Sequence, residues 1–329
     1  MNRSSPSAVV VCIITVACFS TGCARPTIGG SQVKQPAPQV GLVELWSEPT
    51  DIAQRDLFWG GSRRAEAPSI DDVYTVLSLD KTGYSRGYDV TGADGREWAV
   101  KVGDEAQSEI VLSRILWALG YYQPQMFYVT GWRLAGEWEK EGEPARFRLQ
   151  SDHESDGEWA WLENPFAGTR PLQGLVAISL VLNNWDLKTS NNRVYRLRAD
   201  NAEPAKRYVV QDLGASLGKT SYPTLLKWFR LRGFGQGTRN DIAGFETQGF
   251  LERVDEDSRV TFDYRGIYKD VISIVRADDV RWTCALLARL SDEQWGDAFR
   301  AGGYAPEHAA RYVKKLKEKI AQGIALKGA

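Results

Sequence analysis

Hydrophobic and polar residues alternate over short stretches in the first half of the chain, starting near residue 73. This period of two predicts strands at residues 73–79, 88–91 and 97–102. The turn before the third strand, Gly92-Ala93-Asp94-Gly95, has the Asp-Gly sequence of a tight hairpin. Three successive strands with short turns predict an antiparallel meander. Further strands are predicted at residues 125–134, 145–150 and 158–162.

A helical period interrupts these strands between residues 104 and 119, and Gly120 is expected to end that helix. Glu105 and Glu109 fall on the same stripe of the helix as two leucines. An acid on an inward-facing stripe is costly unless a cation meets it, so we expect a basic partner.

The second half of the chain is mostly helical in pattern. Residues 172–182 are apolar nearly all round, which predicts a buried helix. Residues 215–265 are glycine-rich and irregular, and further helices are predicted at residues 278–290, 292–301 and 306–322. Strands followed by helices indicate an α+β protein.

The first residues have the pattern of an export signal. Arg3 precedes an apolar run at residues 8–19, and small residues lead to Cys23. The ending Thr21-Gly22-Cys23 resembles a bacterial lipobox, although Ser20 stands where leucine is usual. We expect a signal peptide at residues 1–23, a flexible linker at 24–45, and export to the bacterial cell envelope with a lipid anchor in the membrane. Ordinary secretion and an uncleaved anchor are the alternatives.

Composition excludes several classes of function. The formal net charge of −1 gives no overall attraction to nucleic acid, so no nucleic-acid partner is expected. Two histidines are too few for a histidine-rich metal site and make a Ser-His-Asp hydrolase implausible. Three of the four cysteines lie in the first 23 residues, which leaves Cys284 alone and excludes a disulfide framework.

Four short motifs occur in an informative order. Asp186-Leu187-Lys188-Thr189-Ser190-Asn191 follows the apolar helix directly, and Asp212-Leu213-Gly214 ends the hairpin predicted after it. Upstream, Ala99-Val100-Lys101 lies on the third strand and Glu109 on the first helix. Together they resemble the catalytic loop, the Asp-Phe-Gly motif, and the strand lysine with its helix partner of the protein-kinase-like superfamily, over roughly residues 70–300.

The resemblance implies an α+β fold of two lobes. An antiparallel β-sheet with one main helix would form the first lobe, over residues 46–168, and a mostly helical lobe would follow at 169–329. It also implies ATP as nucleotide, with Mg²⁺ or Mn²⁺. Phosphoryl transfer asks the protein for positioning and charge compensation rather than covalent chemistry, and these residue types can supply both.

The resemblance assigns the nucleotide side of the site. Lys101 would meet the phosphates, and Glu109 would fix its direction, with Glu105 one turn earlier as the alternative. The turn between Gly83 and Gly87 would cover the phosphates.

It also assigns the metal and the catalytic residues. Asn191 and Asp212 would bind the metal through hard oxygen donors, with Asn192 as the alternative to Asn191. Asp186 would orient the acceptor hydroxyl and take its proton. Lys188 would neutralise charge on the transferred group.

Departures from the family pattern limit what the resemblance implies. Asn184 and Trp185 stand where the catalytic loop usually has histidine and arginine, which disfavours control by an activation-loop phosphate. The glycine-rich loop lacks its full Gly-x-Gly-x-x-Gly pattern, and no Ala-Pro-Glu follows Asp212 at the usual distance. The sequence therefore resembles divergent relatives such as HipA-like, Fam20-like, CotH-like or small-molecule kinases.

The leading functional hypothesis is an exported ATP-dependent phosphotransferase acting on a hydroxyl of a protein or a small molecule. The alternatives are a catalytically silent, kinase-like binding module and a nucleotidyl transferase using the same cleft. Scarcity of ATP outside the cytoplasm favours the silent module. Retention of Asp186, Asn191 and Asp212 together favours an enzyme.

Overall fold

The computed structural model describes residues 41–80, 84–135, 140–150, 154–196, 206–220 and 237–327. The predicted signal peptide, most of the linker, and Gly83 lie outside these ranges. No helix within them combines the length and the apolar character needed to cross a membrane.

A curled seven-stranded sheet forms the smaller lobe. Its spatial order is β4-β7-β3-β2-β1-β5-β6, and the predicted antiparallel meander of β1, β2 and β3 is confirmed. β5 pairs with β1 in parallel and so begins to close the sheet on itself. The strands are β1 (Val73–Asp80), β2 (Arg86–Thr91), β3 (Glu97–Val102), β4 (Met126–Val129), β5 (Arg133–Leu134), β6 (Lys140–Glu141) and β7 (Ala145–Leu149).

The two faces of this sheet have different contents because side chains alternate along each strand. One face holds a separate hydrophobic cluster that includes Trp98, Val100, Trp132 and Phe147. Residues paired across the strands share a face, so Lys101 on β3 lies on the opposite face together with its register partners on β2 and β7, Gly87 and Arg146.

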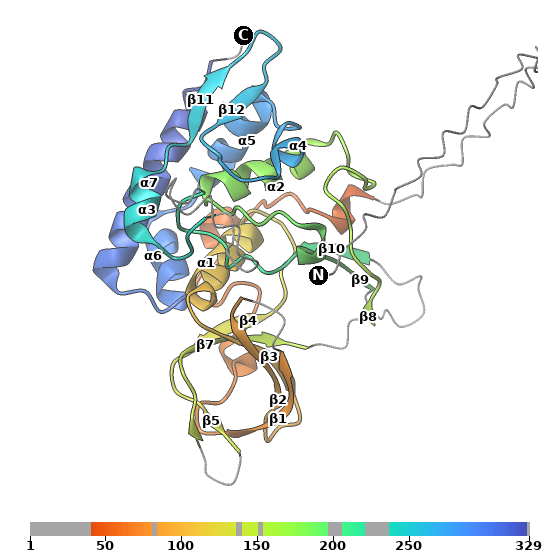
Figure 1. Cartoon of the computed structure of the whole chain (residues 1–329), viewed down its shortest axis with the longest axis vertical. Coiled ribbons are helices and arrows are strands. Elements are labelled where there is room, and N and C mark those ends of the chain that lie inside the picture. Colours follow the sequence, from red (N-terminus) through yellow and green to blue (C-terminus); the bar gives the residue numbers. More distant parts are fainter. Residues whose placement is uncertain are drawn as a thin grey trace, which may run out of the picture. The chain divides into compact units, whose positions relative to one another are not determined.

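One helix, α1 (Glu105–Ala118), packs between the sheet and the larger lobe. It contacts β3, β4 and β7 on one side and α6 on another (Figure 1). Gly120 follows it with φ of +95°, and a side chain there would collide with the Ser47 carbonyl. The predicted helix end is therefore where the chain needs glycine.

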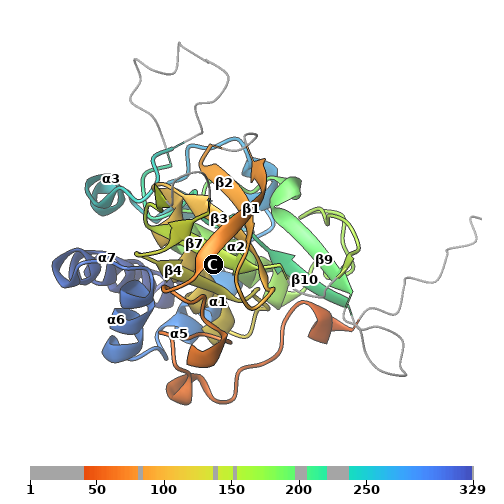
Figure 2. The same ribbon diagram turned by 90° about the horizontal axis from the view of Figure 1, so that it is seen from below.

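Helices dominate the larger lobe, as the pattern predicts. Figure 2 shows α6 and α7 on one side of α1 and the β9–β10 hairpin on the other, in agreement with Figure 1. The helices are α2 (Arg170–Val181), α3 (Ile242–Thr247), α4 (Lys269–Ile272), α5 (Ala277–Leu287), α6 (Asp292–Ala301) and α7 (Pro306–Ile324). The remaining strands are β8 (Glu154–Ser155), β9 (Asn192–Arg196), β10 (Lys206–Val210), β11 (Leu251–Val254) and β12 (Val260–Phe262).

Three details differ from the sequence prediction. Residues 125–134, predicted as one strand, form two short strands, β4 and β5, with residues 130–132 outside any strand. Residues 158–162 form no strand. The side chains of Trp159 and Trp161 pack on each other, with ring centroids 5.0 Å apart, and this packing rather than pairing with a strand holds the segment. Within the irregular region 215–265, α3 and the β11–β12 hairpin are regular elements that short, weakly periodic segments did not reveal.

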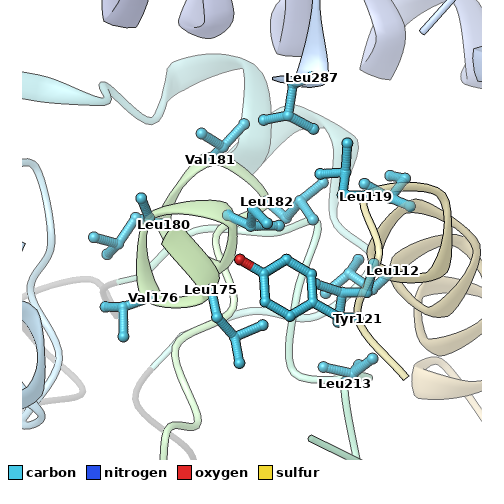
Figure 3. Close-up of a cluster of buried hydrophobic side chains, with 14 of the residues drawn as sticks. Leu112, Leu119, Tyr121, Leu175, Val176, Leu180, Val181, Leu182, Leu213 and Leu287 are labelled. Atoms are coloured by element: carbon cyan, nitrogen blue, oxygen red, sulfur yellow. The ribbon is translucent and has the colours of Figure 1, made fainter. Parts of the chain in front are cut away.

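A large hydrophobic cluster joins α1, α2, α5, α6 and α7. The predominantly apolar α2 lies within it, as predicted. Tyr121 lies between the ribbons of α1 and α2, and its hydroxyl donates to the Pro171 carbonyl at 2.7 Å (Figure 3). Leu213 belongs to the same cluster and lies close to Tyr121. Sheet, single main helix and helical lobe together confirm the predicted α+β fold of two lobes.

Candidate active site

Lys101 joins the two lobes through its ammonium group. Its Nζ lies 3.0 Å from Glu109 Oε2 on α1 and 2.9 Å from Asp212 Oδ1 in the larger lobe. Glu105, one helical turn before Glu109, is also near, at 3.6 Å. The structure therefore brings together three residues that the motif order assigned to one site.

Glu109 is fully buried and has two cationic partners. Lys101 contacts one carboxylate oxygen, and Arg146 Nε on β7 lies 3.2 Å from the other. Burial opposes ionisation, but Arg146 and Lys101 outweigh it and keep the pKa of Glu109 below its ordinary value. Arg146 is held in turn by the Ala99 carbonyl, which accepts from its Nη1 at 2.7 Å. The buried acid on the helix stripe thus has the basic partners that its position requires.

The backbone around Asp212 fixes its direction. Asp212 has φ of +50°, a left-handed conformation that a non-glycine residue adopts at a cost. Leu213 anchors the turn in the hydrophobic core, and Gly214 packs so closely on Glu105 that a side chain there would collide with it. The Gly214 carbonyl accepts from Ser108 Oγ on α1 at 2.9 Å. The strained turn is therefore held on both sides.

The charge state of Asp212 follows from its neighbours. Burial opposes ionisation, but the ammonium of Lys101 and the guanidinium groups of Arg148 and Arg146 outweigh it. They hold the pKa of the Asp212 carboxyl well below its usual range. Asp212 is therefore an anion at neutral pH, which suits a ligand for a hard cation.

The loop after α2 holds Asp186 from three directions. Its backbone N–H donates to Asn184 Oδ1 at 3.2 Å, and its carbonyl accepts from Asn191 Nδ2 at 2.8 Å. Lys188 Nζ lies 2.8 Å from Asp186 Oδ2. Lys188 is half-exposed, whereas the Asp186 side chain is mostly buried. The two predicted catalytic residues are thus in direct contact.

Backbone hydrogen bonds tie this loop to the segment that carries Asp212. Trp185 N–H donates to the Ala215 carbonyl at 3.1 Å, and Leu217 N–H donates to the Leu182 carbonyl at 3.0 Å. Gln211 N–H donates to the Asn191 carbonyl at 2.7 Å. Asp186, Asn191 and Asp212 therefore lie on neighbouring, hydrogen-bonded segments of the larger lobe.

The oxygen atoms present fit a hard divalent cation. Asn191 Oδ1 is buried and has no hydrogen-bond partner within the described ranges. Asn192 Oδ1 is equally unpartnered, but the amide of Asn192 donates to the Trp159 carbonyl, whereas that of Asn191 donates to the Asp186 carbonyl. Within those ranges no cluster of three His, Cys, Asp or Glu forms a self-sufficient metal site. Mg²⁺ commonly takes one or two protein oxygens and completes its shell with phosphates and water, so two oxygens such as those of Asn191 and Asp212 would be enough as the protein's share.

Gly87 lies elsewhere than expected. It belongs to β2, not to the turn before it, and pairs with Lys101 in the sheet. A side chain at Gly87 would come within 2.9 Å of Asp80 Cβ on β1. Glycine at position 87 therefore allows β1 and β2 to pack closely, next to Lys101 on β3. Gly83 lies outside the described residues.

A cavity of about 650 Å³ adjoins the Lys101 row of the sheet. Ala99 and its register partners Asp89 and Arg148 line it. Ala99 lies two residues before Lys101 on β3 and therefore on the same face of the sheet. Tyr195 and Val209, from the β9–β10 hairpin, line it from the larger lobe. The cavity therefore lies between the lobes, next to the charged cluster.

Comparisons with known proteins give a limited picture. No protein-family model matches the chain, and no curated protein has significant sequence similarity to it. Among solved structures it resembles the proinflammatory kinase CtkA of Helicobacter pylori, at 11% identity and a TM-score of 0.45, over 76% of this chain and 94% of that one. It also matches the kinase domain of maize SIRK1, a sucrose-induced receptor kinase, bound to AMP-PNP. That match has 15% identity and a TM-score of 0.23, and it covers 79% of this chain and 98% of the maize chain.

Three charged residues of the site were missed by sequence reasoning. Arg146 and Arg148 alternate with Phe147 on a predicted strand, and arginines at the alternate positions of a strand with a buried face were the available signal. Arg239 Nε lies 2.6 Å from Glu105 Oε1, 134 positions away in sequence. Nothing in the irregular region around Arg239 indicates that contact.

Proposed function

We propose that the protein is an ATP-dependent phosphotransferase that transfers a phosphoryl group to a hydroxyl of a protein or a small molecule. One observation carries the proposal: a single ammonium, that of Lys101, bridges a buried acid on α1 and the anionic Asp212 of the other lobe, each within 3.0 Å. A lysine placed in this way can bind phosphates without losing its orientation.

The phosphate side of the site is built for charge compensation. Lys101 would contact the nucleotide phosphates, and Glu109 with Arg146 behind it would keep the ammonium in place. Asn191 and Asp212 would hold Mg²⁺ or Mn²⁺, which when bound would neutralise charge on the phosphates. The Lys101–Asp212 ion pair marks the position that phosphate oxygens would share.

The acceptor side centres on Asp186. Its carboxylate would orient the acceptor hydroxyl and take its proton as the hydroxyl attacks the γ-phosphorus of ATP and the bond to the leaving nucleoside diphosphate, ADP, breaks. Lys188, 2.8 Å from that carboxylate, would stabilise the transferred group.

The nucleotide base would enter the 650 Å³ cavity between the lobes. Ala99 offers a small side chain that leaves room for a flat ring. Arg148 Nη1 is buried with no hydrogen-bond partner among the described residues, so a donor is available there for a base or ribose oxygen.

We further propose that the protein acts outside the cytoplasm, anchored to the bacterial envelope by a lipid on Cys23. The support is the sequence of residues 1–23 and its resemblance to a lipobox. An exported enzyme of this kind would need a supply of nucleotide at its location.

Two measurements test the proposal. Thermal unfolding with ATP and Mg²⁺ or Mn²⁺ should show a midpoint raised by about 5 °C at saturating nucleotide, because a ligand that binds only the native state stabilises it. Labelled ATP offered with protein and sugar acceptors should then give labelled product. Stabilisation without transfer to any acceptor would favour the silent binding module, release of inorganic pyrophosphate instead of ADP would favour nucleotidyl transfer, and no stabilisation would refute nucleotide binding.

A further inference from the structure

Glu105 occupies the first turn of α1 and is the meeting point of several groups. Ser85 Oγ, from the segment before β2, donates to Glu105 Oε2 at 3.0 Å. Lys101 Nζ lies 3.6 Å from that same oxygen. The other oxygen, Oε1, lies 2.6 Å from Arg239 Nε. An acid close to the lysine that would bind phosphates is a competitor for it, unless its charge is satisfied elsewhere.

Arg239 satisfies that charge from the larger lobe. Its guanidinium carbon lies 3.8 Å from the ring centroid of Tyr84 and 4.5 Å from that of Trp185, so it is held between two aromatic rings. Tyr84 belongs to the turn on the phosphate side of the sheet, and Trp185 directly precedes Asp186. The Arg239 side chain is only 9% exposed.

These contacts link three parts of the site. Arg239 contacts the turn before β2, the start of α1, and the loop that carries Asp186. Gly214 packs directly on Glu105, so the Asp212 turn adjoins the same point. Trp185 stands where a kinase loop usually has arginine, and here its ring stacks on an arginine that comes from a different segment.

We propose that Arg239 is a positioning residue of the phosphate site. It neutralises the carboxylate of Glu105, so that the ammonium of Lys101 stays available to pair with Glu109, Asp212 and the nucleotide phosphates. Both residues of the Arg239–Glu105 ion pair are encoded in the chain, so the contact forms without phosphorylation or any other covalent modification. This inference rests on the proposed function, because it assigns Arg239 a role in the same site.

The test compares nucleotide affinity in full-chain variants, with ATP and Mn²⁺ as the probe. Arg239→Ala frees Glu105 to pair with Lys101, and the dissociation constant should rise about tenfold, or about 1.4 kcal/mol. Glu105→Gln in the Arg239→Ala background removes the competing charge and should recover at least half of that loss on a logarithmic scale. Arg311→Ala is the matched control, because Arg311 forms an exposed ion pair of the same 2.6 Å length with Glu246. It should leave affinity unchanged.

Rescue by Glu105→Gln distinguishes positioning through charge from a purely structural role, because a second substitution at a damaged contact would otherwise only add to the damage. If Arg239→Ala does not fold, Arg239→Lys replaces it, with an expected rise of about threefold that Glu105→Gln again relieves. Unchanged affinity in the single variant, or no recovery in the double variant, overturns the inference. Failure of the wild-type chain to bind nucleotide overturns the proposed function instead.

Discussion

Lys101 on β3 and Asp212, 111 positions later in the chain, form an ion pair of 2.9 Å across the two lobes. The pair joins a residue fixed by the sheet to a residue fixed by the hydrophobic core through Leu213. Its geometry therefore depends on how both lobes pack against α1. Substitutions at this ion pair and at the residues next to it therefore test most of the proposed function.

Substitution of the two aspartates should separate nucleotide binding from transfer. Asp212→Asn removes the charge that would hold the metal, so stabilisation by ATP and Mn²⁺ should fall by more than half. Asp186→Asn leaves the phosphate side intact, so stabilisation should persist while the transfer rate drops at least about 100-fold. Thermal unfolding and labelled ATP measure the two effects. Equal loss of binding in both variants would contradict the division of roles.

Glu109→Gln should weaken the fold as well as the site. The substitution leaves Arg146 buried without its carboxylate partner, which typically costs about 3 kcal/mol in the free energy of unfolding. Glu246→Gln, at an exposed ion pair with Arg311, should change stability little and serves as the control. Urea unfolding of the three proteins checks the difference. Similar midpoints for both variants would show that Glu109 is not structurally important.

Acid pH should reveal the depressed pKa of Asp212. Because the folded-state pKa lies below the ordinary value of 3.8, the unfolded chain takes up a proton first as pH falls. The stability that this group contributes is complete above about pH 5 and is lost as pH falls through and below the ordinary value. Asp212→Asn should therefore lose less stability than wild type between about pH 5 and pH 2.5. Urea midpoints as a function of pH give the comparison, and parallel curves would refute it.

Export and lipidation can be tested at Cys23. Cys23→Ser should abolish incorporation of labelled palmitate in a bacterial host and move the protein from the membrane fraction to a soluble or unprocessed form. Cys18→Ser, five residues earlier, is the matched control and should behave as wild type. Label retained in Cys23→Ser would refute the lipobox interpretation.

The sequence predicts well those parts that depend on local order. The strand at residues 97–102, the helix after it and the predominantly apolar α2 follow from period and composition, and the structure confirms them. The Asp-Leu-Lys loop and Asp212 follow from motif spacing, and the structure brings their segments together. Each of these features is specified by residues close together in the chain, so a single sequence is enough to predict it.

Contacts between distant segments could not be predicted in this way. Arg239 meets Glu105 across 134 positions because the larger lobe folds back onto α1, and no periodicity in residues 215–265 indicates it. The sequence pattern places Gly87 at the end of a turn, whereas in the structure it lies on β2, where glycine allows close packing. Trp159 and Trp161 alternate like a strand but are held by ring packing.

Backbone hydrogen bonds join residues 182–185 to residues 215–217, so we expect the oxygen-bearing groups of the larger lobe to move together. If the cleft opens and closes, the motion would be a single displacement, in which the sheet carries Lys101 toward or away from these groups. Probes attached to β2 and β9 would follow that displacement completely. Slow product release, if it limits turnover, should change in step with the distance between them.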